Sequence, residues 1–429
     1  MTAKIIGKKG KKLTIEITVD LEDSMLDSEE AIQESVNKAG ALASEEALKQ
    51  FDTQGQPIEV KGKTLQSKGE EEKRYQTPYG EIKLSRHVYQ YKGKGKTFCP
   101  LEYSARIIGT STPQFSKQVS FKMAYNAARV VQKDLSECHQ RDVSVAFLQN
   151  SSASVAEIVQ KKEGAWHYAL PKIKEEITTI AIGLDGTCMH LKKEGWREAM
   201  TGTISFYNAK TERQHTIYIG ATPEYGKRCF FERFTREIEQ VKSRYPHVKY
   251  IGVADGAEVN WRFLAPYIET EVLDFFHASG YLGAVAKALH PRNSKKQREW
   301  LDIHCHQLKH ESNAADHLYK EMLKAQKEAA GLSKVIKEKL DKTVTYYKNH
   351  KHQMDYAGYA SKKYPIGSGV TEAACKTLIK QRLCLSGMRW KEAGATCILN
   401  LRALNLTAER WHQFWRKINQ FGIGPIPAL

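Results

Sequence analysis

The sequence lacks the patterns that mark exported, membrane-embedded and zinc-binding proteins. Its eight cysteines are scattered singly without a C-x-x-C pair, which argues against a zinc ribbon and against a secreted disulfide framework. The opening residues, MTAKIIGKKGKK, lack the apolar core of a signal peptide, and every apolar run is too short to cross a bilayer. Internal repeats and low-complexity tracts are also missing. We therefore expect a reducing, cytoplasmic location and no membrane partner.

Positive charge is the most informative excess in the sequence. The 66 Lys and Arg residues outnumber the 49 Asp and Glu residues, which gives a formal net charge of +17 over 429 residues. An excess of this size favours a polyanionic partner, DNA or RNA, over neutral or acidic metabolites. Solubility through charge is the alternative explanation. Hydrophobic residues make up 41 % of the chain, which is typical of a globular protein of several domains and excludes wholesale disorder.

Changes in residue pattern divide the chain into segments. They are an N-terminal α+β module or arm at 1–74, a small β region at 75–110, a helical domain at 111–170, an α/β domain built from 175–276 and 361–405, an α-helical insertion at 277–360 and a C-terminal tail at 406–429. The short helices and polar breaks of the helical domain are typical of a helix-turn-helix that binds DNA. A three-helix packing domain without DNA contacts has the same pattern.

The order of elements in the α/β domain predicts its fold. Three strand-like stretches in hairpin order are followed by an amphipathic helix, a buried strand, a second helix, a short strand and, beyond the insertion, a last helix. This β-β-β-α-β-α-β-α order is that of a ribonuclease H-like fold, a mixed sheet with helices on both faces. The first helix, residues 227–245, carries its apolar stripe at Phe230, Phe234, Ile238 and Val241.

Two aspartates end strands of this predicted sheet. Asp185 follows the first strand in GLDGT, and Asp255 follows the fourth strand in GVADGAEVNW. The two strands are neighbours in the predicted fold, so their carboxyl ends bring both side chains together. Each aspartate also has an ordinary explanation. Asp185 with Gly186 is a common hairpin turn, and Asp255 with Gly256 is a common strand end in which the aspartate is a helix N-cap.

A third carboxylate lies within residues 365–390, PIGSGVTEAACKTLIKQRLCLSGMRW. A Gly-Ser-Gly turn opens an uninterrupted helical pattern in which Glu372, Lys376 and Lys380 share one face. Packed beside the sheet, this helix would deliver Glu372 to the two aspartates. Three converging carboxylates repel one another unless a cation binds them, and Mg²⁺ prefers such oxygen ligands. A surface helix with ordinary Glu–Lys pairs is the alternative.

The motifs GLDGT, VADGAEVNW, DFFHASGYL and GSGVTEAACKTLIKQRLCLSGMRW together resemble those of DDE transposases. More narrowly, residues 175–405 are similar to the Kra-type bacterial insertion-sequence transposases, which are related to the Mutator-like group, and the similarity is weaker through 75–165. The resemblance implies that Asp185, Asp255 and Glu372 form a catalytic triad that binds Mg²⁺ or Mn²⁺ as a pair of ions. It also makes the α/β domain the catalytic domain.

A D-x-x-H motif follows the second aspartate. Asp274 and His277 resemble the Cys/Asp-x-x-His signature of Mutator-like enzymes. A histidine at a strand end, paired with a neighbouring carboxylate, is the alternative. Related transposases often carry paired cysteines before a Pro-Leu, whereas a lone Cys99 precedes Pro100 and Leu101 in this chain. We therefore predict no zinc.

The resemblance implies a DNA transposase, which cleaves phosphodiesters at insertion-sequence ends and transfers the freed 3′-OH to target DNA. We expect double-stranded DNA as partner, a bacterial, nucleoid-associated location, and a homodimer or higher synaptic complex, because two element ends are handled together. A ribonuclease H-like nuclease or resolvase without strand transfer and a non-catalytic DNA-binding descendant are the alternatives. The residues expected to neutralise phosphates or to stack on distorted DNA are Lys376, Lys380, Arg382 and Arg389, and Trp261 and Trp390.

Overall fold

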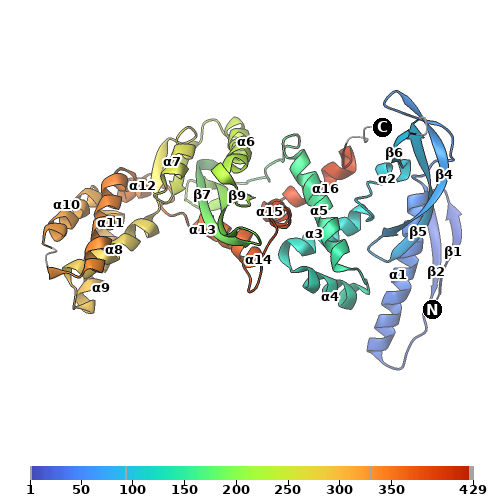
Figure 1. Cartoon of the computed structure of the whole chain (residues 1–429), viewed down its shortest axis with the longest axis horizontal. Coiled ribbons are helices and arrows are strands. Elements are labelled where there is room, and N and C mark those ends of the chain that lie inside the picture. The colour runs from blue at the N-terminus through green and yellow to red at the C-terminus, as the bar shows by residue number, and fades with distance from the viewer. Residues whose placement is uncertain (1, 92–93, 329–330, 425–429) are drawn as a thin grey trace. The chain divides into compact units, whose positions relative to one another are not determined.

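The structure, a computed structural model, is a mixed α/β protein with several sheets and many helices (Figure 1). It describes residues 2–91, 94–328 and 331–424. The chain forms two compact units, which comprise residues 1–169, 400–405 and 409–429, and residues 170–399 and 406–408. Within the described ranges, no helix has both the length and the apolar character needed to span a membrane.

The N-terminal part of the first unit contains a β-hairpin, a long helix and a four-stranded antiparallel sheet. Its elements are β1 (Thr2–Lys9), β2 (Lys12–Thr18), α1 (Met25–Lys49), β3 (Ile58–Val60), β4 (Lys63–Gln76), β5 (Glu81–Tyr91), β6 (Lys94–Phe98) and α2 (Pro100–Ser104). Helix α1 begins after Ser24, whose hydroxyl accepts a hydrogen bond from the Asp27 N–H. Alternation along β5 buries Ile82 and Leu84, which pack with Tyr75 of β4.

A helical cluster completes the first unit. It contains α3 (Pro113–Tyr125), α4 (Ala128–His139), α5 (Val145–Lys162) and α16 (Arg410–Phe421). Phe115 of α3 and Leu148 of α5 belong to one buried cluster. The sequence predicts only a tail at 406–429, but α16 buries Trp411 and Phe414 on one helical face, so this segment is part of the folded unit. DNA binding by the short helices α3–α5 stays a prediction.

The second unit is built on a five-stranded mixed sheet with the strand order β11-β10-β7-β8-β9. Its strands are β7 (Ile177–Leu191), β8 (Gly195–Asn208), β9 (Arg213–Ala221), β10 (Lys249–Ala254) and β11 (Thr270–Leu273). Strand β8 is antiparallel to both β7 and β9. Strand β10 pairs with β7 in parallel, and β11 pairs with β10 in parallel. Helix α6 (Arg228–Arg244) connects β9 to β10, and α7 (Glu258–Leu264) connects β10 to β11.

Helix α6 shows how the sequence pattern produces this packing. The four residues of its predicted apolar stripe are all buried, and they are Phe230, Phe234, Ile238 and Val241. The Phe234 ring lies over Gly202 of β8, where an added Cβ would be 2.9 Å from the ring. Glycine at this position therefore allows the helix to approach the sheet closely.

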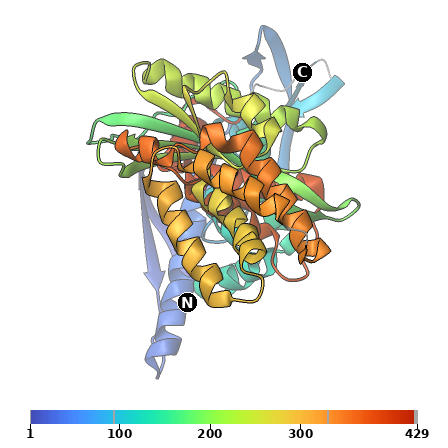
Figure 2. The same cartoon turned by 90° about the vertical axis from the view of Figure 1, so that its left-hand side faces the viewer.

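The helices α8 to α12, which follow β11, lie side by side in a block (Figure 2). They are α8 (Phe275–Leu289), α9 (Ser294–His310), α10 (Ala314–Lys327), α11 (Lys334–His350) and α12 (Tyr356–Ser361). The sequence predicts an insertion at 277–360, and the helical character is as expected. The block also shares one continuous hydrophobic core with the sheet, to which Leu282, Leu318 and Tyr347 belong. It therefore folds as part of the second unit.

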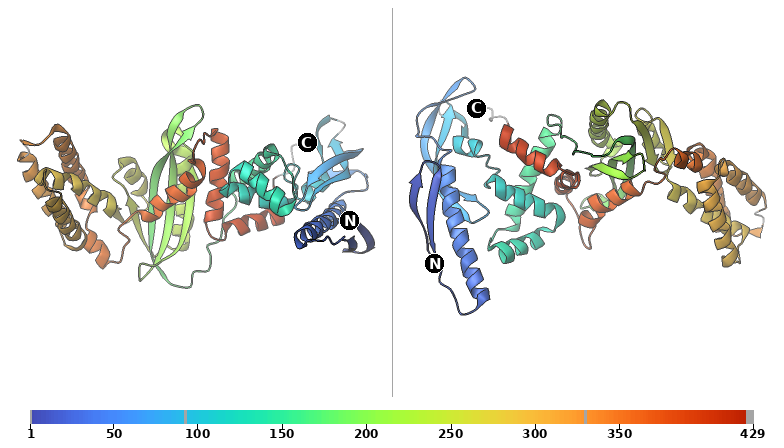
Figure 3. Two further views of the ribbon diagram at one scale, coloured as in Figure 1. Left: turned by 90° about the horizontal axis from the view of Figure 1, so that it is seen from below. Right: turned by 180° about the vertical axis from the view of Figure 1, so that it is seen from behind.

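The segment that carries Glu372 packs against β7 and β8 (Figure 3). It consists of α13 (Gly369–Ala374), a π-helical turn (Cys375–Lys380) and α14 (Gln381–Leu383), and α15 (Glu392–Leu406) follows. The uninterrupted α-helix predicted from the sequence is thus broken by a π-turn, which spaces backbone hydrogen bonds five residues apart and is frequent at functional sites. Glu372, Lys376 and Lys380 are all exposed, as expected for one shared face.

Candidate functional site

The pairing of β7 with β10 brings two aspartates to the same level of the sheet. The parallel register joins residues that are 70 apart, as in Gly252 with Ile182, and Asp255 follows Asp185 by the same interval. Neighbouring strands lie about 4.8 Å apart, and level residues of parallel strands point to the same face. Asp185 is not in a hairpin turn, because β7 continues through Leu191 and pairs Asp185 with Thr201 of β8. The turn explanation for Asp185 is therefore wrong.

The Asp185 carboxylate is partly buried and held by two hydrogen bonds. Its Oδ1 accepts from the Gly186 N–H at 2.7 Å, and its Oδ2 accepts from the Cys375 thiol at 3.4 Å. Burial raises the pKa of Asp185 above its ordinary value, and the charge of Asp255 raises it further, whereas the two hydrogen bonds and His277 lower it. A divalent cation would relieve this repulsion between like charges.

Cys375 is a contact that the sequence reasoning missed. Its thiol is buried, and burial together with the Asp185 charge raises the pKa of Cys375 to about 12. The thiol therefore stays protonated at neutral pH and acts as a hydrogen-bond donor to the carboxylate. Its position three residues after Glu372, on the side of the helix facing the sheet, is the signal that was available in the sequence.

Asp255 lies just beyond β10, in the turn that leads into α7. Its Oδ1 accepts from the Ala257 N–H and from the side-chain amide of Asn260, both at 3.1 Å. The alternative explanation of Asp255 as a helix N-cap is not observed, because the residue that caps α7 is Ala257. The two donors nevertheless fix the orientation of the Asp255 carboxylate.

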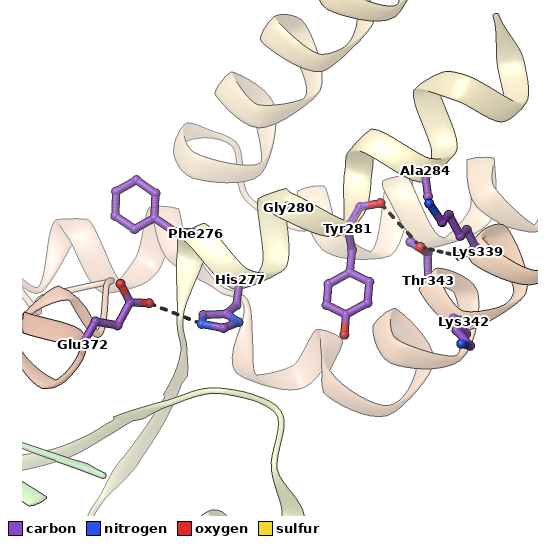
Figure 4. A pocket seen from close by; sticks show the side chains of 9 residues that line it. All are labelled: Phe276, His277, Gly280, Tyr281, Ala284, Lys339, Lys342, Thr343 and Glu372. Atoms are coloured by element: carbon purple, nitrogen blue, oxygen red, sulfur yellow. Dashed lines mark hydrogen bonds and ion pairs between the residues drawn. The ribbon is translucent and has the colours of Figure 1, made fainter. Parts of the chain in front are cut away.

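Glu372 lies in the first turn of α13 and shares a cleft of about 780 Å³ with Asp185, Lys376 and Lys380. Its side chain is 47 % exposed, and its Oε1 is 3.3 Å from Nε2 of His277 (Figure 4). The cleft thus brings Asp185 and Glu372 together, whereas Asp255 is not among its lining residues. Carboxylate oxygens are the ligands that Mg²⁺ and Mn²⁺ prefer, so these side chains fit the expected ions chemically.

The seat of α13 on the sheet depends on Gly183 of β7. The hydroxyls of Thr371 and Thr203 are hydrogen-bonded at 2.7 Å across this contact. An added Cβ at Gly183 would be 2.3 Å from the Thr371 hydroxyl and 3.1 Å from the Val253 carbonyl oxygen. Glycine at this position therefore allows the helix that carries Glu372 to lie directly on β7.

We expect Gly183→Ala to lower the free energy of unfolding by about 1–3 kcal/mol through overpacking, and to slow any reaction that depends on Glu372. Gly220→Ala in β9 is the matched control, because its Cβ would meet the nearest atom, of Leu399, at 3.7 Å. Urea unfolding of both variants measures the difference. Equal midpoints for the two variants would contradict the assigned role of Gly183.

The D-x-x-H motif joins two distant parts of the chain. Asp274 is fully buried at the N-cap of α8, where its Oδ1 accepts from the His277 N–H at 2.6 Å. Its Oδ2 accepts from the N–H of Ser368, at the start of α13. The backbone N–H of Phe275 also donates to the Ile366 carbonyl at 3.0 Å. Asp274 thus fixes the start of α8 to the segment that leads into Glu372.

Asp274, His277 and Glu372 form a compact group of side chains. One possible ligand atom from each of these residues lies within 4.8 Å of the others, so this group, which does not include Asp185 or Asp255, is a candidate for holding a cation. Asp274 already accepts two backbone N–H groups, which explains its position without an ion. His277 is exposed at the rim and lies beside Glu372.

Two of the predicted DNA contacts are contradicted by burial. Arg382 is 2 % exposed and stacks over the Trp390 ring at 5.2 Å, so its guanidinium does not reach a phosphate. Trp261 is 6 % exposed and packs beneath Gly252, so it cannot stack on DNA. Trp390 is partly exposed, and its indole N–H donates to the Leu383 carbonyl at 2.9 Å.

The remaining predicted contacts are accessible. Lys376, Lys380 and Arg389 are exposed, and the two lysines line the cleft that contains Asp185 and Glu372. No protein-family model matches the chain, and a comparison with curated proteins finds no similar sequence.

Proposed function

We propose that this protein is a DNA transposase of the DDE type with a ribonuclease H-like catalytic core, resembling the Kra-type insertion-sequence enzymes. The observation that carries the proposal is the placement of Asp185 on β7 beside Asp255, which directly follows the neighbouring strand β10, with Glu372 in the same cleft as Asp185. The strand order β11-β10-β7-β8-β9 supports the assignment of the core. The net charge of +17 supports DNA as the partner.

The proposed metal ligands are Asp185, Asp255 and Glu372. A pair of Mg²⁺ or Mn²⁺ ions held by these carboxylates would supply activation of an attacking oxygen and stabilisation of the leaving oxygen. The protein orients the carboxylates through the Cys375 thiol, the Asn260 amide and the Thr371–Thr203 contact. His277 lies where it can hold Glu372 in place.

The proposed reaction has two displacements at phosphorus. In the first, a water oxygen bonds to phosphorus and the bond to the 3′-oxygen breaks, which leaves a 3′-OH on the element and a 5′-phosphate on the flank. In the second, this 3′-OH bonds to a target phosphorus and displaces the target 3′-oxygen, which leaves as a 3′-OH. Each attacking oxygen loses a proton to solvent, and each leaving oxygen gains one.

The test is incubation of DNA that carries the element ends with Mg²⁺, Mn²⁺ or EDTA, followed by analysis of the products. Metal-dependent joining of the 3′ end to a second DNA identifies a transposase. Nicks without joined products identify a nuclease or resolvase, and binding without cleavage in either metal favours a DNA-binding protein. Measurement of molecular mass with and without these ends tests the proposed homodimer or higher complex.

The exposed lysines of the cleft predict a change in salt dependence. We expect Lys376→Ala with Lys380→Ala to weaken binding to all DNA sequences and to reduce the slope of log affinity against log salt by about 2, because each neutralised phosphate contributes about 0.9. The matched control removes Lys295 and Lys296, which are exposed on α9. The prediction fails if the double variant and the control show the same slope.

A further inference from the structure

A groove between α8 and α11 opens beside Glu372 (Figure 4). Its volume is about 490 Å³. The residues that define it are Phe276, His277 and Tyr281 from α8, Lys339 and Lys342 from α11, and Glu372 at one end. The helical spacing of these residues places them on the facing sides of the two helices. The proposed triad and the D-x-x-H motif do not account for the aromatic residues or the lysines.

The α8 side of the groove presents two aromatic rings to solvent. Phe276 is 68 % exposed, although a large apolar side chain gains by burial. The Tyr281 ring stacks on Tyr346 with ring centres 4.0 Å apart and an angle of 16° between the planes, so its position is fixed by packing. Gly280, one turn after Phe276, leaves open space where a Cβ would lie. This surface is preformed for a flat, apolar group.

The α11 side contributes positive charge. Lys339 and Lys342 are exposed, and neither forms an ion pair with a residue in the ranges that the structure describes. The groove therefore has aromatic rings on one side, two cations on the other and a carboxylate of the proposed triad at its end. An occupant that matches all three has a flat aromatic ring, carries negative charge and extends to the candidate metal site. A nucleotide in a DNA strand has these properties.

We propose that this groove binds an unstacked base of a single DNA strand, with Phe276 and Tyr281 against the base and Lys339 and Lys342 beside the neighbouring phosphates. The assignment deepens the proposed function, on which it rests, because it names a substrate subsite next to Glu372. Contact with aromatic rings offsets the loss of stacking in the duplex. Holding one nucleotide out of the helix also fixes the position of the adjacent phosphodiester relative to the carboxylates.

The experiment compares two probes of equal charge in EDTA, where no cleavage occurs. One is an oligothymidylate of about eight nucleotides, and the other is an abasic oligomer with the same number of phosphates. We expect Phe276→Ala to bind the oligothymidylate about 5- to 100-fold more weakly than wild type, with little change for the abasic oligomer. Tyr281→Leu should give the same pattern. Phe421→Ala on α16 is the matched control, because Phe421 is also exposed.

Lys342→Ala tests the other side of the groove. Its loss should weaken both probes by a similar factor, because both carry the same phosphates. A second measurement locates the base directly: an oligomer containing 5-iododeoxyuridine should crosslink to Phe276 or Tyr281 on irradiation. Crosslinks that map only outside the groove, or an equal loss of both probes in Phe276→Ala, overturn the proposal.

The result separates this subsite from the proposed function. If wild-type protein joins DNA ends while Phe276→Ala binds both probes as wild type does, the base subsite is wrong and the transposase proposal stands. In the opposite case, Phe276→Ala binds the oligothymidylate more weakly but the abasic oligomer as wild type does, and wild-type protein cleaves no DNA in any metal. The groove is then a single-strand binding site and the transposase proposal is wrong. Phe276 is exposed, so its replacement by alanine leaves the core intact.

Discussion

Asp255→Asn is expected to slow metal-dependent DNA cleavage by ~10³-fold or more and to leave the fold intact. The substitution removes the charge of Asp255, which follows β10 and adds to the effect of burial in raising the pKa of Asp185 on β7, and with it one of the proposed metal ligands. The asparagine oxygen can still accept from the Ala257 N–H and the Asn260 amide. Single-turnover cleavage in Mg²⁺ and Mn²⁺ measures the effect, and electron paramagnetic resonance measures the loss of Mn²⁺ binding.

Glu258→Gln is the control for a lost negative charge near the same turn. Glu258 is three residues from Asp255, and its side chain is 84 % exposed in an ion pair with Arg262. An exposed pair of this kind contributes little to stability, so cleavage should stay close to wild type. Cleavage by Asp255→Asn within about tenfold of wild type, with Mn²⁺ still bound, would remove Asp255 from the proposed triad.

Much of the sheet was readable from the sequence because the strands carry strong local patterns. Strand β10 is apolar on both faces, as a central parallel strand requires. It pairs with β7 between residues that are 70 positions apart in sequence, and Asp185 and Asp255 have the same separation. The sequence predicts that the first strand ends at Asp185, because Asp-Gly is also a turn signal, whereas β7 continues to Leu191. The alternation beyond Asp185, with Met189 and Leu191 buried and Cys188 exposed, indicates that the strand continues.

The surface of the site was less predictable, because residue type alone does not determine exposure. Arg382 is buried because its guanidinium packs on Trp390, whose backbone in turn is hydrogen-bonded to His190 and Lys192 at the end of β7. Trp261 is buried because it belongs to the core that the sheet shares with its helices, near Gly252 of β10. The burial of Arg382 and of Trp261 depends on contacts between different helices and strands. Local pattern does not contain that information.

The contact of Asp274 with Ser368 is likewise a contact between residues far apart in the chain, because 94 positions separate them. The D-x-x-H motif identified the residue, and its spacing is compatible with an N-cap, because the cap oxygen accepts from the N–H three residues later. The second hydrogen bond, from the Ser368 N–H to Asp274 Oδ2, cannot be predicted from local sequence, because Ser368 lies beyond the helices α8 to α12 in the chain. That contact assigns Asp274 a role in positioning α8 and α13.

Asp274→Ala is expected to lower the free energy of unfolding by about 2–5 kcal/mol, even in EDTA. The substitution leaves two backbone N–H groups without their acceptor, the buried one of Ser368 and the partly buried one of His277, and the loss of an acceptor for a buried group costs about 1–3 kcal/mol. Asp274→Asn should cost less, because its single carbonyl oxygen can still accept from one of the two. Urea unfolding with and without Mg²⁺ measures both variants.

His277→Gln is the matched variant from the same motif. The His277 side chain is 47 % exposed, so its loss should leave the unfolding midpoint close to wild type while DNA cleavage slows, because Glu372 loses its neighbour. If Asp274 instead served mainly as a metal ligand, Asp274→Ala would match wild type in EDTA and differ only when Mg²⁺ is present. A stability loss that is independent of metal, combined with a cleavage defect in His277→Gln, would assign the aspartate to positioning and the histidine to the reaction site.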